Sequence, residues 1–210
     1  MKILTIADLE EKTFNYRSCK NLFKLFLREF PSMKLDWETS WNEWTIKLLT
    51  FFAELGKLYD FEVYLTPKCG VLTSNKENTS EYLVDLSWCF EDEKKRAEWI
   101  ELALESELSS QDIDEIMYDF SKLVDIKSYV KVGIFAPKLS DRDTLIEDLE
   151  ERVAISPIKI PSESYLIILI LYHGTTEKSS KRIEIAGYEI NFCGESKLIE
   201  SKRFPAKIKE

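Results

Sequence analysis

The chain has 210 residues, 44% of them hydrophobic and 12% aromatic, with a net charge of −9. This size and composition suit a globular protein with a sizeable core and exclude disordered and fibrous chains. The longest apolar run, YLIILILY at 165–172, is far shorter than the ~20 residues that span a bilayer, and the N-terminal sequence lacks the layout of a signal peptide. We therefore expect a soluble, cytoplasmic protein with no membrane partner.

The cysteines and the charge distribution restrict the kinds of site that the chain can contain. Four cysteines are scattered without a CxxC pair, which indicates neither a zinc cluster nor a disulfide framework. Residues from 174 onward carry a charge of +2, so residues 1–173 carry −11. Because DNA affinity comes largely from Lys and Arg, the best DNA-binding surface would be the basic segments 178–182 and 201–209. A solvated terminal segment explains them equally well.

Two helices are predicted in the first part of the chain. Apolar side chains recur at helical spacing between residues 22 and 30, and Pro31 ends this pattern. The second helix covers residues 40–61, with Ser40 as its N-cap, Glu43 in the capping-box position and Gly56 near its end. We divide the chain into a helical N-terminal extension (1–39), a core (40–139) and a C-terminal α/β completion of the same domain with a mildly basic tail (140–210).

The remaining elements alternate between strand and helix patterns. Strands are expected at 61–65, 81–90, 97–108, 129–137, 165–173 and 183–192, the last one either a single strand or a hairpin, and helices at 109–126, capped by Ser109, and at 141–153. The two strands around the charged turn 91–96 should form an antiparallel hairpin. Helical crossovers before 129–137 and 165–173 predict parallel neighbours. The expected fold is α/β, a mixed sheet flanked by helices.

Three carboxylates form the candidate site. Glu105 and Glu107 end an otherwise apolar strand and share one face, with Cα atoms ~6.6 Å apart. By the same alternation, Trp99, Glu101 and Ala103 should lie on their face. Asp85 interrupts the apolar run of the preceding strand, so it should lie beside the pair if the strands are hairpin partners. Three acids without a nearby His or Cys favour Mg²⁺ or Mn²⁺, which can activate water for phosphodiester hydrolysis.

These residues resemble the PD-(D/E)XK nuclease superfamily, which includes restriction endonucleases. Residues 40–137 follow the order of its core, one helix, three strands, a helix and a fourth strand. The resemblance implies that Asp85 of LVDLSW is the metal-binding Asp and that Glu105 of LALESEL is the acid of (D/E)-x-K. Glu107 stands where Lys is usual. Some members carry E-x-E here, and in others the lysine lies on the next helix, where this chain has Lys122.

The resemblance also implies an acid from the first helix, for which Glu43 and Glu54 are the candidates. Glu43 has a competing role in capping, so Glu54 is the candidate for supporting the metal. Asp119 shares the polar face of the helix with Lys122. We expect a restriction-endonuclease-like core that cleaves DNA, as a homodimer if cleavage is sequence-specific.

Other readings of the same residues remain open. Glu105 and Glu107 could be surface residues at a strand end, and Lys122 a solvated lysine. The alternative function is a catalytically inactive interaction or regulatory protein on the nuclease fold. His173 is the single histidine, and without a GxSxG motif a hydrolase triad has little support. Trp37, Trp41 and Trp44 fit core packing better than base stacking.

Overall fold

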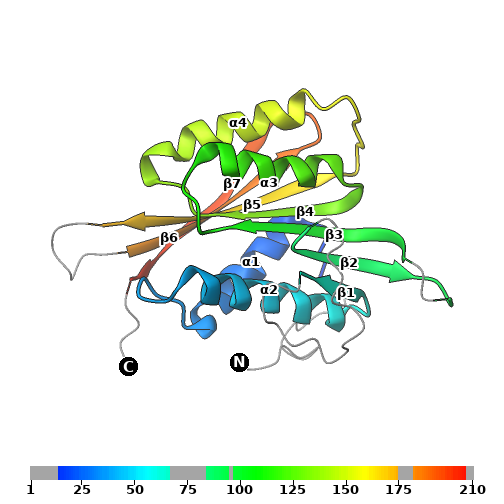
Figure 1. The fold of residues 1–210 in the computed structure, drawn as a ribbon, viewed down its shortest axis with the longest axis horizontal. Coiled ribbons are helices and arrows are strands. Elements are labelled where there is room, and N and C mark those ends of the chain that lie inside the picture. The colour runs from blue at the N-terminus through cyan, green and yellow to red at the C-terminus, as the bar shows by residue number, and fades with distance from the viewer. Residues whose placement is uncertain (1–13, 67–83, 95–96, 175–181, 207–210) are drawn as a thin grey trace.

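Seven strands form one mixed sheet in the computed structural model, which describes residues 14–66, 84–94, 97–174 and 182–206 (Figure 1). The strands are β1 (Glu62–Leu65), β2 (Leu86–Glu91), β3 (Ala97–Glu107), β4 (Ser128–Phe135), β5 (Ser164–His173), β6 (Arg182–Asn191) and β7 (Ser196–Pro205), and their order in the sheet is their order in the chain. β4 lies parallel to β3 and to β5, and all other neighbours are antiparallel. The predicted β2–β3 hairpin and both parallel crossovers are confirmed.

Helices cover both faces of this sheet. α1 (Cys19–Glu29) and α2 (Trp41–Leu58) lie on one face, and α3 (Ile113–Asp125) and α4 (Arg142–Ala154) lie on the other (Figure 1). Short 3₁₀ helices, η2 (Phe30–Met33) and η4 (Leu139–Asp141), follow α1 and precede α4. The α/β class with helices flanking a mixed sheet is therefore as predicted. None of the helices among the described residues is long and apolar enough to cross a membrane.

The core consists of two apolar clusters separated by the sheet. The first joins the inner faces of α1 and α2 to one side of the strands, with Phe23, Phe52 and Leu104 among its fully buried members. The second joins α3 and α4 to the other side, with Phe120 and Leu149 as examples. Because both faces of β3 are covered, the face that carries Ala103 and Glu105 is buried as well.

The N-terminal and C-terminal parts belong to the same core. α1 packs on β5 and β6 and places Leu22, Phe23 and Phe26 in the first cluster, so the described part of segment 1–39 forms a layer of the fold. The segment predicted as a basic tail contains β7, which lies at the edge of the sheet beside β6. Most of the basic segment 178–182 lies outside the described residues.

Several local predictions need correction. Asp112, and not Ser109, caps α3, since its carboxylate accepts a hydrogen bond from the Asp114 N–H. The strict alternation predicted for β3 fails at Glu101. Trp88 pairs with Leu102 while the next residue pairs with Ile100, which leaves Glu101 as the extra residue of a β-bulge. The buried Glu101 carboxylate accepts hydrogen bonds from Arg17, which precedes α1.

Candidate active site

Glu105 lies near the carboxyl end of β3, on the face that α3 covers. The residue is 2% exposed, so its carboxylate is almost completely removed from water. Among the described residues, its Oε1 is a buried oxygen to which no hydrogen bond is donated. A buried carboxylate oxygen without a donor is costly, because burial removes its hydration without a replacement. Such an atom marks a position where a cation or a ligand donor would stabilise the protein.

Asp85 lies beside Glu105 across the β2–β3 pair. It is half-buried and comes immediately before the first residue of β2, Leu86, so the prediction that it lies within a strand is wrong by one position. Its Oδ2 accepts a hydrogen bond of 2.9 Å from the backbone N–H of Ser106, the residue after Glu105. Because β2 runs antiparallel to β3, the start of β2 meets the end of β3, and the predicted proximity of these two acids is confirmed.

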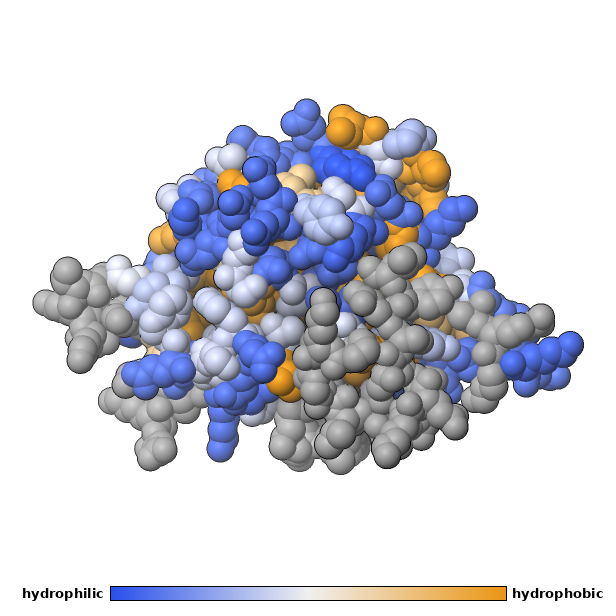
Figure 2. Space-filling view, viewed as in Figure 1, coloured by the Kyte–Doolittle hydropathy of each residue, from blue (hydrophilic) through white to orange (hydrophobic). Residues whose placement is uncertain are grey.

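Lys122 completes this group from α3. Its Nζ lies 3.3 Å from Glu105 Oε1 and 2.7 Å from an oxygen of Asp119, one turn earlier on the helix. The contact with Glu105 is an ion pair by distance but does not have the geometry of a hydrogen bond, since Oε1 has no donor. The Lys122 side chain is 35% exposed, and the surface over α3 and α4 is mostly hydrophilic (Figure 2). Lys122 thus contacts the buried Glu105 carboxylate and is itself partly exposed to solvent.

Burial and neighbouring charges shift the pKa values of Glu105 and Lys122. Burial and then the negative charge of Asp85 raise the pKa of the Glu105 carboxyl to about 8, although Lys122 opposes both. Burial alone would lower the pKa of the Lys122 ammonium, but Asp119 and Glu105 together raise it above its usual range. At neutral pH the group therefore contains a permanently charged lysine beside a carboxyl group that is largely protonated.

Glu107 and Glu54 were also predicted as site residues, but neither contacts Glu105 through the hydrogen bonds and ion pairs described below. Glu107 accepts hydrogen bonds from the Ser109 hydroxyl (2.7 Å) and the Ser110 N–H (2.8 Å), so it holds the turn that leads from β3 toward α3. Glu54 lies on α2, across the sheet from Glu105, and pairs with Lys57 on its own helix at 3.5 Å. Within the described residues, no cluster of three or more His, Cys, Asp or Glu side chains could hold a metal ion. The carboxylates brought together are Asp85 and Glu105.

Ser40 caps α2 as predicted, and the Glu43 carboxylate pairs with a lysine of the same helix. The Glu43 backbone N–H donates to the Ser40 hydroxyl, and its carboxylate pairs with Lys47 at 2.7 Å. Like Glu54, it lies on α2 and does not reach the pair. Neither of these two acids of α2 therefore joins the group around Glu105.

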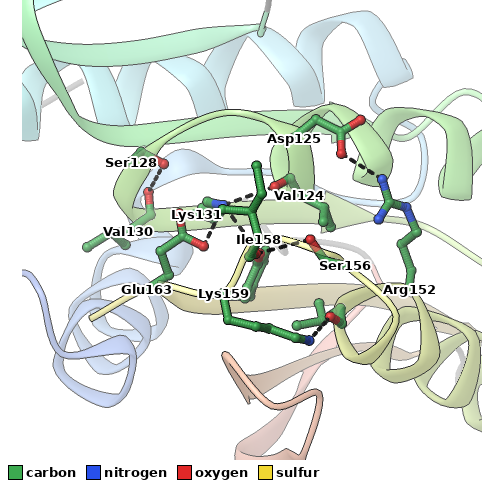
Figure 3. A network of polar contacts seen from close by, with 12 residues as sticks. Val124, Asp125, Ser128, Val130, Lys131, Arg152, Ser156, Ile158, Lys159 and Glu163 are labelled. Atoms are coloured by element: carbon green, nitrogen blue, oxygen red, sulfur yellow. Dashed lines mark hydrogen bonds and ion pairs between the residues drawn. The ribbon is translucent and has the colours of Figure 1, made fainter. Parts of the chain in front are cut away.

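A second polar network fixes α3 against the sheet (Figure 3). Lys131 of β4 is fully buried, its Nζ lies 3.0 Å from Glu163, and it donates to Val124 O at the end of α3 (3.4 Å) and to the Tyr165 hydroxyl (3.2 Å). Burial lowers the pKa of its ammonium, although Glu163 opposes this effect. The prediction from sequence missed this network, for which the lysine inside the apolar run YVKVGIF was the available signal.

Arg152 of α4 forms hydrogen bonds that hold α3 against α4. Its guanidinium donates to the Ser121 hydroxyl (3.1 Å) and to the Asp125 carboxylate (2.7 Å). Ser121 precedes Lys122, so the tie lies next to the lysine of the candidate site. Together with Lys131, this contact fixes the position of Lys122 relative to Glu105.

His173 belongs to a separate cluster on the strands β5, β6 and β7. Its Nε2 lies 2.7 Å from the buried Glu184, which also accepts hydrogen bonds from Ser201 (2.7 Å) and Arg203 (2.9 Å). Burial would raise the pKa of the Glu184 carboxyl, but these three donors lower it below its usual range. Ser201 bonds to Glu184 and not to the imidazole, so the arrangement is not that of a nucleophilic triad.

Comparisons of the chain with protein-family models, with curated proteins and with solved structures found no match. The function must therefore be inferred from the site itself.

Proposed function

We propose that this protein is a metal-dependent phosphodiesterase that hydrolyses DNA, with a site of the PD-(D/E)XK type built from Asp85, Glu105 and Lys122. The observation that carries the proposal is the buried Glu105 carboxylate, which lies beside Asp85, the residue before β2, and within ion-pair distance of Lys122 on α3. Buried acids and a lysine that perturb one another's pKa values in this way are typical of functional sites.

The order and pairing of the elements support a restriction-endonuclease-like core. α2 precedes three antiparallel strands, β1 to β3, after which α3 crosses over to the parallel β4. The resemblance places an Asp at the second of these strands and a Glu at the end of the third. Asp85 and Glu105 occupy these positions. Lys122 on α3 would take the place of the lysine that Glu107 displaces in the motif.

The donor set fits Mg²⁺ or Mn²⁺ held by Asp85 and Glu105. These hard ions are commonly bound through one or two carboxylates, with waters and substrate phosphate oxygens as the other ligands. The Glu105 Oε1 atom, which accepts no hydrogen bond and has the Lys122 ammonium 3.3 Å away, is the oxygen that such an ion would use. When bound, the ion would supply a Lewis acid that activates water and stabilises the leaving oxygen of a phosphodiester. Asp85 and Glu105 must both be ionised to hold it.

The protein's own side chains have distinct roles in this scheme. Glu105 must lose its proton before it can act as a ligand, because its pKa lies near 8 without metal. Lys122 stays protonated, since its neighbours raise its pKa, and it therefore acts as a fixed positive charge and not as a base. In that role it would stabilise the negative charge that develops on the phosphate oxygens during the reaction. Asp119 would orient the Lys122 ammonium.

The test is cleavage of plasmid and single-stranded DNA in the presence of Mn²⁺. Glu105→Gln and Lys122→Met should each lower the rate by about 10²- to 10³-fold, the usual cost of removing one electrostatic contact to the transition state. Glu101→Gln is the matched control, because Glu101 is an equally buried acid of β3 that pairs with Arg17. Equal cleavage by the wild type and Glu105→Gln would identify a contaminating nuclease and contradict the proposal.

The alternative is an inactive interaction or regulatory protein on the same fold. The contact between Lys122 and Glu105 favours it, because the Lys122 ammonium already lies 3.3 Å from the Glu105 oxygen that a metal would use. In that case the wild type should show no cleavage, and Mn²⁺ should not change its stability.

A further inference from the structure

An aromatic cavity opens at the carboxyl edge of the parallel strands β4 and β5. It has a volume of about 210 Å³, and its walls come from the segment before α2, from Ala136 and Pro137 after β4, and from the end of β5. Its volume is below the 300 Å³ or so of a typical drug-sized pocket and suits a single small ring.

The walls of the cavity are unusually rich in aromatic rings. Trp37 stacks on Tyr172 with ring centroids 3.6 Å apart, and Trp41 contacts Trp37 edge-on at 6.2 Å. Trp37 is nevertheless 39% exposed, whereas Trp44 behind it is buried. A large indole that is held by neighbouring rings and is still 39% exposed can offer aromatic surface to a further planar ring.

The polar groups of the cavity indicate an uncharged ligand. Its lining residues carry no formal charge, and the polar side chains among them are Thr39, Ser40 and Gln111. The Thr39 hydroxyl bonds to Asp36, and the Ser40 hydroxyl caps α2. The exposed Gln111 amide is the group best placed to offer both a donor and an acceptor to the edge of a ring.

The cavity and the candidate active site lie at the same edge of the sheet, because the end of β3 is next to the end of β4. Trp37, Trp41 and Gln111 also line a neighbouring hollow, which contains Ser109 and Ser110. These two serines donate to Glu107, which lies two residues after Glu105 on β3. A DNA strand that reaches both places would pass this hollow, which is also lined by Lys138 and by three aspartates, Asp112, Asp114 and Asp141.

We propose that this cavity binds an unstacked nucleobase of a single-stranded or locally opened DNA substrate by stacking on Trp37 and by hydrogen bonds to Gln111. The proposal rests on the proposed phosphodiesterase function and specifies its substrate. It also suits an acidic protein. Because the 29 Lys and Arg are outnumbered by 38 Asp and Glu, the net charge of −9 opposes phosphate binding, and base stacking and the bound metal would supply most of the affinity.

The test compares binding of fluorescein-labelled oligodeoxythymidylate with binding of a matching abasic oligonucleotide, in Ca²⁺ to prevent cleavage. The wild type should prefer the oligonucleotide with bases by about 5- to 150-fold, which corresponds to one stacked base. Trp37→Ala should lose this preference, and Trp37→Phe should keep part of it. Trp99→Ala is the matched control, since Trp99 is 42% exposed and lies near the opposite end of β3, stacked on Phe90.

The outcomes separate this proposal from the proposed function. Equal binding of both oligonucleotides by the wild type would overturn the cavity proposal, and this comparison does not depend on whether any variant folds. Cleavage that depends on Glu105 but has the same KM in Trp37→Ala would also overturn it and leave the phosphodiesterase intact. A base preference that depends on Trp37 without any cleavage would support the cavity and contradict the enzyme.

Discussion

The charge state of Glu105 contributes to the dependence of this protein's stability on pH. Its pKa is raised from 4.5 to about 8 in the folded protein. A group whose pKa is higher in the folded than in the unfolded protein stabilises the fold fully at a pH below the unfolded pKa. This stabilisation is lost as the pH rises through the folded pKa. Between pH 4.5 and about 8, Glu105 therefore makes the protein progressively less stable, and above pH 8 the effect is constant.

The perturbation is Glu105→Gln, which keeps the shape of the side chain and removes its titration. Each tenfold change in a dissociation constant is worth about 1.4 kcal/mol, so the raised pKa corresponds to an upper limit of about 5 kcal/mol. Even half of this is a large fraction of the stability of an ordinary domain, about 5–15 kcal/mol. We expect the variant to gain about 2–5 kcal/mol relative to the wild type between pH 4.5 and pH 9.

The assay is urea unfolding of both proteins at several pH values with a metal chelator. The difference in their free energies of unfolding isolates Glu105, because the other titrating groups are shared. A saturating concentration of Mg²⁺ at pH 8 should stabilise the wild type and Glu101→Gln but not Glu105→Gln. A difference between wild type and Glu105→Gln that does not change with pH would refute the reasoning from burial and from Asp85.

Three further predictions concern the site and the network that supports it. At limiting Mn²⁺, the cleavage rate of the wild type should rise with pH up to about 8, because the metal must displace the proton of Glu105; a pH–rate profile flat from pH 6 to 9 would contradict this. Lys122→Arg should recover part of the rate lost in Lys122→Met, measured in single-turnover cleavage, since it restores the charge. Lys131→Met should destabilise the protein by about 3–5 kcal/mol in urea unfolding, because it leaves the Glu163 carboxylate buried without its partner. Lys131→Met combined with Glu163→Leu should cost clearly less, and equal losses in the two would show that the ion pair contributes little.

The elements with strong periodicity could be predicted from the sequence, and so could the acids inside them. α3 and β3 have regular patterns of apolar residues, and Glu105 interrupts such a pattern at a position where a buried charge needs a reason. The pairing of β2 with β3 then brings Asp85 close to Glu105, because hairpin strands are neighbours in the sheet. Lys122 followed from the position of α3, although its distance from Glu105 depends on how the helix packs.

The remaining features depend on contacts between distant parts of the chain. The β-bulge at Glu101 arises together with its partner Arg17, which is 84 residues away in sequence. The Glu107 carboxylate accepts hydrogen bonds from the Ser109 hydroxyl and from the Ser110 backbone N–H, so these local contacts hold it in a turn. β7 is an exposed edge strand whose charged residues conceal its pattern. The aromatic cavity joins Trp37 to Tyr172, and no local pattern encodes that contact.

The central claim is that Asp85 and Glu105 form a site for a divalent cation. Titration calorimetry with Mn²⁺ at pH 7, in two buffers with different ionisation enthalpies, tests it most directly. We expect the wild type to bind Mn²⁺ with release of a proton from Glu105, and we expect Glu105→Gln to lose both the binding and the proton release while Glu101→Gln keeps them. Absence of binding in the wild type, or equal binding by Glu105→Gln, would contradict the account.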